Sequence, residues 1–294
     1  MKDLVKPPFA TYDVVVYFGA GLFAVPFLIR YLAVPLGLPD PAFLTEESDQ
    51  VAFEIVRILT IITFVYVLGH IIAFFSSHLI EKALDRFFGK ISTAILVSSG
   101  STKINRNQHV REHFKDRTSR IRADNATLSS FIRGLFHLPN CIFYAIIYVS
   151  GIFGYFDTRI PRSTLEKAEK NYRRWIEEAD LATDIPWFKS LEYYVINRIP
   201  TAVPRMYNYL VIAGLFRSLS FIFLVSAWWV LFFSSAYQFT GVWPLKSTDN
   251  LNGDGVGFFE FAILSSASVF SLMAYIKFQR RYAEETIFAF AYAE

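Results

Sequence analysis

Five polar side chains share one stripe of an otherwise apolar segment: Thr63, Tyr66, His70, Ser77 and Glu81. In a helix that turns about 100° per residue, they lie within about 60° of one another. Polar groups at membrane depth usually face a bundle interior or a water-filled cavity. The stripe therefore predicts a hydrated path for ions or protons. Interhelical hydrogen bonds, with Glu81 at the membrane interface, are the simpler alternative.

A second set of residues has the charge to bind phosphate groups. The segment 82–133 carries eleven Lys or Arg against four acids. Phe114 is the one aromatic residue there that lies among the basic side chains and suits base stacking. We predict an anionic ligand, a nucleotide or an oligonucleotide, and keep lipid headgroups as the alternative. The predicted binding residues are Arg106, Arg111, Lys115, Arg117, Arg120 and Arg122.

Two short motifs resemble metal sites. His109, Glu112 and His113 spell the inverted zincin pattern, but they lie in an arginine-rich stretch and have no evident third ligand. Asn250, Asn252 and Asp254 resemble the opening of a calcium loop, although the loop begins with Asn and its twelfth position is not Glu. We therefore predict a solvated arm and a tight external turn, with no metal and no cofactor.

Two further features lie in the C-terminal third of the chain. Arg217 interrupts an apolar run, and because Leu219–Phe239 is long enough to cross a bilayer alone, we expect Arg217 to extend to the interface. A span that included Leu210–Phe216 would bury it instead. Small residues form a surface suited to close helix packing, or alternatively to a serine-lined pore: Ala262, Ser265, Ser266, Ala267, Ser268, Ser271 and Ala274.

The elements that position these residues are membrane helices. Of 294 residues, 53% are hydrophobic, and several apolar runs reach the length of about 20 residues that crosses a bilayer. The chain is predicted to be all-α, an integral membrane protein with four spans at about 14–36, 55–75, 219–239 and 258–278. The first run is longer than a signal-peptide core, so we expect it to be retained. The single cysteine, Cys141, excludes a disulfide within the chain.

Basic residues predict the orientation of the chain. Lys and Arg beside short loops stay in the cytoplasm, which places 82–134 and the cluster Lys277, Arg280 and Arg281 on that side. Both termini and the segment 157–205 are then cytoplasmic. The apolar run 135–156 must enter and leave on one face, either as a re-entrant hairpin bent at Pro139-Asn140 or as a helix buried in a cytoplasmic bundle. We predict a single membrane domain with cytoplasmic insertions at 82–134 and 157–205.

Two cytoplasmic amphipathic helices are predicted within 157–205. A capping box at Ser163 and Glu166 begins a helix that ends near Ala182. A second helix, starting near Asp184 and ended by Pro200, has an aromatic face suited to the membrane surface. The pairs Arg280–Glu284 and Arg281–Glu285 favour a helix that continues beyond the last span. The apolar tail 287–292 is expected to pack on the cytoplasmic helices or on a neighbouring subunit.

Function follows from architecture more than from motifs. The chain has no Walker loop and no nucleophile elbow, so an enzyme is disfavoured. Four spans beside a basic cytoplasmic block resemble the small multi-spanning effectors of bacterial anti-phage systems. The resemblance implies a homo-oligomeric channel in the bacterial inner membrane that a nucleotide or oligonucleotide controls. The alternatives are a non-conducting scaffold that recruits a cytoplasmic protein partner, and a membrane metal enzyme that uses His109 and His113.

Overall fold

The computed structural model describes residues 12–33, 51–84, 134–141, 145, 149, 160–179, 187–240 and 254–293. Every regular element in these ranges is a helix, which confirms the all-α prediction. Four helices are long and apolar enough to cross a membrane: Asp13–Tyr31, Val51–Leu84, Val203–Phe232 and Gly257–Ala291. Each overlaps a predicted span. The chain is therefore a multi-pass membrane protein.

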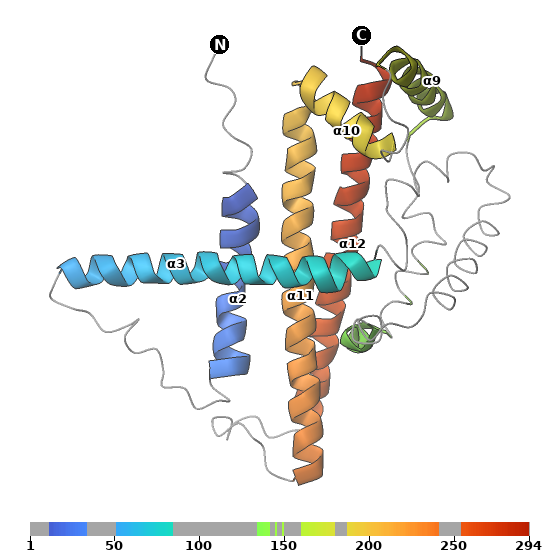
Figure 1. Ribbon diagram of the computed structural model, residues 1–294. Helices are drawn as coiled ribbons and strands as arrows, with labels where there is room; N and C mark the ends of the chain where they lie inside the picture. Colours follow the sequence, from blue (N-terminus) through green and yellow to red (C-terminus); the bar gives the residue numbers. More distant parts are fainter. Residues whose placement is uncertain are drawn as a thin grey trace.

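Helices α11 (Val203–Thr240) and α12 (Asp254–Ala291) form the central pair. They run antiparallel and side by side along most of their length (Figure 1). Each has 38 residues and is therefore about 57 Å long at 1.5 Å per residue, well beyond the roughly 30 Å of a hydrocarbon core. Both helices must therefore project from the membrane. Because α11 begins 16 residues before the predicted span, Arg217 lies inside it.

The N-terminal helix joins this pair, whereas α3 crosses it. The first helix consists of η1 (Asp13–Phe18), α2 (Gly19–Leu28, with Pro26 inside) and η2 (Ile29–Ala33). Helix α3 (Val51–Ser76) continues through the π-helical turn η4 (Ser77–Glu81). In Figure 1, α3 runs across α2 and α11 instead of alongside them. Large apolar side chains are exposed along its whole length, from Val51 to Phe75.

Two glycines let α3 approach the first helix closely. A Cβ atom on Gly69 would lie 1.8 Å from the carbonyl oxygen of Tyr17, and one on Gly21 would lie 1.9 Å from the carbonyl oxygen of Val65. Both neighbours are backbone atoms, which no side-chain rotation can move away. Small residues at helix crossings are typical of membrane bundles because they let the backbones touch. The crossing therefore depends on the absence of two side chains.

The directions of three helices can be compared from where each begins and ends. The beginning of η1, the beginning of α11 and the end of α12 all lie at the upper end of the molecule in Figure 1. The end of η2, the end of α11 and the beginning of α12 lie at the lower end. The first helix and α11 thus run in the same direction, and α12 runs in the opposite one.

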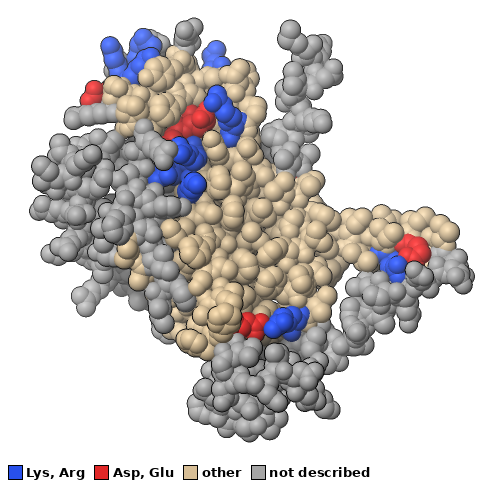
Figure 2. All heavy atoms as spheres, turned by 180° about the vertical axis from the view of Figure 1, so that it is seen from behind, with Lys and Arg blue, Asp and Glu red and all other residues tan. Residues whose placement is uncertain are grey.

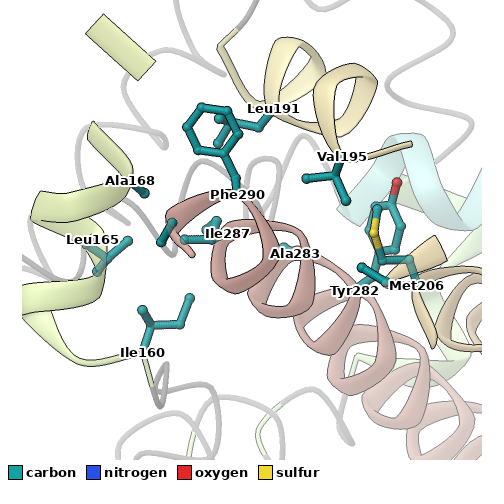
Figure 3. Packing of buried hydrophobic residues seen from close by; sticks show 12 residues of the cluster. Ile160, Leu165, Ala168, Leu191, Val195, Met206, Tyr282, Ala283, Ile287 and Phe290 are labelled. Atoms are coloured by element: carbon teal, nitrogen blue, oxygen red, sulfur yellow. The ribbon is translucent and has the colours of Figure 1, made fainter. Parts of the chain in front are cut away.

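A cap of short helices covers the upper end. It consists of α9 (Arg162–Ala179), α10 (Trp187–Arg198) and the last turns of α12 (Figure 3). Leu165 of α9, Leu191 of α10 and Ile287 of α12 are buried together in one core. The prediction that the apolar tail packs on the helices of segment 157–205 is therefore confirmed for packing within one chain.

The structure of the cap differs from the sequence-based predictions in three details. The face of α10 with Phe188, Leu191 and Tyr194 packs in the cap core, so it is not free to lie on a membrane. Helix α9 begins at Arg162, one residue ahead of the predicted cap at Ser163. The predicted end near Ala182 lies outside the described residues. Arg281 pairs with Glu284 at 3.2 Å. Glu285, its predicted partner, pairs instead with Arg205 at 3.3 Å, because the start of α11 lies beside the end of α12.

Candidate functional site

The first polar group at the crossing of α3 and α11 is an ion pair. Arg217 of α11 pairs with Glu81 of η4, and the hydroxyl of Ser77 donates to the same Glu81 oxygen, Oε2, at 3.2 Å. The side chain of Arg217 is 12% exposed and that of Glu81 is 34% exposed. The guanidinium is therefore mostly enclosed by neighbouring helices. It is retained within the bundle because α11 continues on both sides of it and η4 supplies a carboxylate.

The second polar group is an aromatic stack around His70. The imidazole ring of His70 stacks on Tyr17 of η1 with centroids 3.8 Å apart, and Tyr66 meets the His70 ring edge to face at 4.5 Å. His70 remains exposed on its other side. The close approach at Gly69, the preceding residue, brings Tyr17 within reach. Tyr17 was not among the predicted site residues, and its place in an apolar N-terminal run was the only signal for it.

The structure thus divides the predicted polar stripe into three parts. Thr63 is exposed and donates to the carbonyl of Leu59 in its own helix at 2.8 Å. Tyr66 and His70 contact Tyr17 of the first helix, Glu81 pairs with Arg217 of α11, and Ser77 donates to Glu81 within η4. The stripe therefore does not face a single partner, because α3 crosses its neighbours and only a few turns meet each of them.

The third set of polar contacts is made by the beginning of the run 135–156. This segment packs on α11 and α12 and is not part of the cap. The indole nitrogen of Trp228 donates to the carbonyl of Phe136 at 2.7 Å, and Phe136 stacks on Phe221. Asn140, in the short 3-10 helix η6 (Leu138–Asn140), donates through Nδ2 to Ser268 Oγ at 2.9 Å. These partners lie in the apolar stretches of α11 and α12. Residues 134–141 therefore pack on α11 and α12.

A hydrogen bond from His137 joins this segment to η4, the continuation of α3. Its Nε2 lies 2.9 Å from the carbonyl oxygen of Leu79, in the π-helical turn. A carbonyl only accepts, so Nε2 carries the proton and donates. His137 is buried outside the four spans, and burial lowers the pKa of its imidazole below 6.5. The folded protein therefore holds a neutral imidazole at this position.

Acid should weaken the docking of this segment. The unfolded chain binds a proton at His137 near pH 6.5 while the folded chain resists it, so the unfolded state binds more protons and stability falls as pH drops below 6.5. We expect a loss of about 1.4 kcal/mol per pH unit from this group until the folded pKa is reached. Thermal unfolding of the wild type and of His137→Gln between pH 7.5 and 5 measures it. Equal pH dependence of the two proteins would contradict this prediction.

The other predicted site residues fall largely outside the described ranges. This holds for all six arginines and lysines of the anionic-ligand prediction, for His109 and His113, and for Asn250 and Asn252. Asp254 begins α12. Within the ranges that the structure covers, no group of three or more His, Cys, Asp or Glu is arranged to hold a metal ion.

Charged side chains are unevenly distributed over the described surface. In the view from behind, they gather at the capped end (Figure 2). Smaller groups lie at the opposite end and on the N-terminal part of α3, which projects from the other helices. At the end opposite the cap, Arg30 pairs with Glu260 at 2.8 Å, and Tyr31 also donates to Glu260. The described surface between the two ends is largely uncharged in this view, as a membrane-facing surface requires.

Comparison with known proteins finds no matching family model, no similar curated protein and no similar solved structure. The function must therefore be inferred from the residues of this chain.

Proposed function

We propose that the protein forms an oligomeric membrane channel or pore in which the Glu81–Arg217 pair controls opening. The observation that carries the proposal is the position of this pair. Arg217 lies within an apolar helix, 14 residues from its beginning, and its Nε has no hydrogen-bond partner among the described residues. Charges inside membrane helices are costly and usually mark paths of ions or protons. A pair between crossing helices can separate when α3 moves.

Several copies of the chain are needed in this proposal. Four spans are too few for a conventional transporter built from internal repeats in one chain. Helix α3 also exposes apolar side chains around its circumference, among them Val56, Leu59 and Phe64. These surfaces suit contact with lipid or with neighbouring subunits. A path between subunits would bring the exposed side of His70 and the Glu81 carboxylate toward water.

Ion flux through reconstituted protein tests the proposal. We expect liposomes containing the wild-type protein to release a trapped monovalent ion, and Glu81→Gln to change the rate several-fold. The matched control is Glu260→Gln, which breaks the ion pair with Arg30 at the opposite end, where Arg30 is 59% exposed. Sealed vesicles without flux, with or without a polyanion, would exclude a channel and favour the scaffold, for which the packed cap offers a rigid surface.

Control by an anionic ligand belongs to the same proposal and rests on the charge of segment 82–133. We propose that this segment and both termini face the cytoplasm of a bacterial cell and that a nucleotide or oligonucleotide binds there. Charge reversal at Arg117 and Arg120 should weaken binding of a labelled oligonucleotide by at least about tenfold at low salt and reduce its salt dependence. Lys167→Glu with Lys170→Glu on the cap is the control. Binding that does not respond to salt would count against the prediction.

A further inference from the structure

Two serines join α11 to α12 at full burial. The Ser220 hydroxyl donates to the carbonyl of Ser268 at 3.0 Å, and the Ser268 hydroxyl donates to the carbonyl of Ser220 at 2.9 Å. Neither side chain has any exposed surface. Each hydroxyl has one proton, and this reciprocal arrangement uses both. The oxygen of Ser268 can then act toward a third group only as an acceptor.

This arrangement fixes the orientation of the Asn140 side chain. With Ser268 Oγ as the acceptor, the atom of Asn140 that lies 2.9 Å from it is assigned as the amide nitrogen, Nδ2. The amide oxygen, Oδ1, then points away from Ser268. Asn140 is 0% exposed, and Oδ1 has no hydrogen-bond partner among the described residues. A buried amide oxygen without a donor is unfavourable, so the site calls for a ligand.

Ser265 brings a second oxygen of the same kind. It lies three residues before Ser268, on the adjacent turn of the same side of α12. Because the helices are antiparallel and Ser220 faces Ser268, Ser265 lies at the level between Ser220 and Trp228, which is the stretch that segment 136–140 covers. Ser265 is 0% exposed, and its Oγ also has no hydrogen-bond partner in the described part of the chain.

The ligand chemistry follows from these atoms. Both are neutral oxygens, which favour hard cations over soft ones. Calcium and magnesium prefer sites with carboxylates. Carbonyl-type oxygens without a formal charge suit a monovalent ion instead, because they replace its hydration shell. We propose that Asn140 Oδ1 and Ser265 Oγ are ligands of a binding site for Na⁺ or K⁺ at the contact of η6 with α11 and α12. The site does not depend on the channel proposal.

Ion-specific stabilisation of the purified full-length protein tests this site. Thermal unfolding would be followed in detergent while Na⁺ or K⁺ replaces N-methyl-D-glucamine at constant ionic strength. We expect a saturable rise of the midpoint with Na⁺ or K⁺ and none with the bulky cation. Ser265→Ala should weaken the apparent affinity at least about tenfold.

Ser218→Ala is the matched control, because it removes another buried hydroxyl without a hydrogen-bond partner among the described residues. Ser218 lies two residues before Ser220 and therefore on nearly the opposite side of α11. This variant should keep the wild-type ion response. Identical unfolding curves in all three cations would overturn the proposal and leave a buried water as the occupant. Equal loss of the response in Ser265→Ala and Ser218→Ala would also overturn it. Absence of flux in liposomes would leave the site intact and remove only the channel.

Discussion

Replacing Glu81 by glutamine is expected to destabilise the folded protein by about 3 kcal/mol, more than replacing Arg217 by glutamine. Glu81→Gln leaves the Arg217 guanidinium charged, because arginine does not release its proton, and only 12% of that side chain is exposed. Arg217→Gln leaves a carboxylate that is 34% exposed and still accepts a hydrogen bond from Ser77. The two single variants are therefore unequal.

The double variant distinguishes a paired charge from two independent ones. Glu81→Gln with Arg217→Gln removes both charges, so its loss of stability should be smaller than that of Glu81→Gln alone. Thermal and denaturant unfolding in one detergent measures all three proteins. Arg30→Gln removes a guanidinium that is 59% exposed and should change stability by less than about 1 kcal/mol. Additive losses in the double variant would mean that the two side chains do not act as a pair.

Flux measurements on the same variants connect stability to function. If the pair holds α3 in a closed position, Glu81→Gln should raise the ion flux of reconstituted protein. A changed stability with an unchanged flux would assign the pair a structural role only. The two measurements thus distinguish an ion pair that controls opening from one that only holds two helices together.

An alanine at Gly69 should be the most damaging small substitution in the first half of the chain. The new Cβ would lie 1.8 Å from the Tyr17 carbonyl oxygen and 2.5 Å from its carbon, both in the backbone of η1. Helices η1 and α3 would have to separate, which breaks the stack of Tyr17 on His70. We expect a loss of about 3 kcal/mol or more, at the upper end of overpacking costs. Thermal unfolding measures it.

Two other glycines provide controls for this prediction. Gly21→Ala should act like Gly69→Ala, because its Cβ would meet the Val65 carbonyl from the other side of the same crossing. Gly19→Ala should be nearly neutral, since its closest neighbour would be 3.7 Å away. Wild-type stability in Gly69→Ala would show that α3 does not cross the first helix this closely.

The sequence was informative where physical requirements are local. Length and hydropathy along the chain predict four helices, because a bilayer demands a run of apolar residues of fixed length. The amphipathic pattern at 165–179 predicted α9, since one face had to be buried. Each of these inferences uses neighbours within one segment.

The polar contacts could not be read in the same way, because they join residues far apart in the chain. Arg217 has an apolar stretch on both sides, and only the approach of η4 shows that Glu81 can neutralise it. The aromatic face of α10 has the pattern of a membrane-surface helix and of a packed helix alike. In the structure this face is packed, because it belongs to the same core as Leu165 of α9 and Ile287 of α12.

Composition and periodicity by themselves determined that this protein is a helical membrane protein, since each helix satisfies its own backbone hydrogen bonds and a bilayer selects apolar side chains. Tertiary structure decided which polar groups meet. It made α3 cross the other helices, through two glycines whose missing side chains permit backbone contact. It also placed Asn140 against Ser268, and left Asn140 Oδ1 and Ser265 Oγ unpartnered among the described residues. Such pairings depend on helix direction and depth, which no single segment encodes.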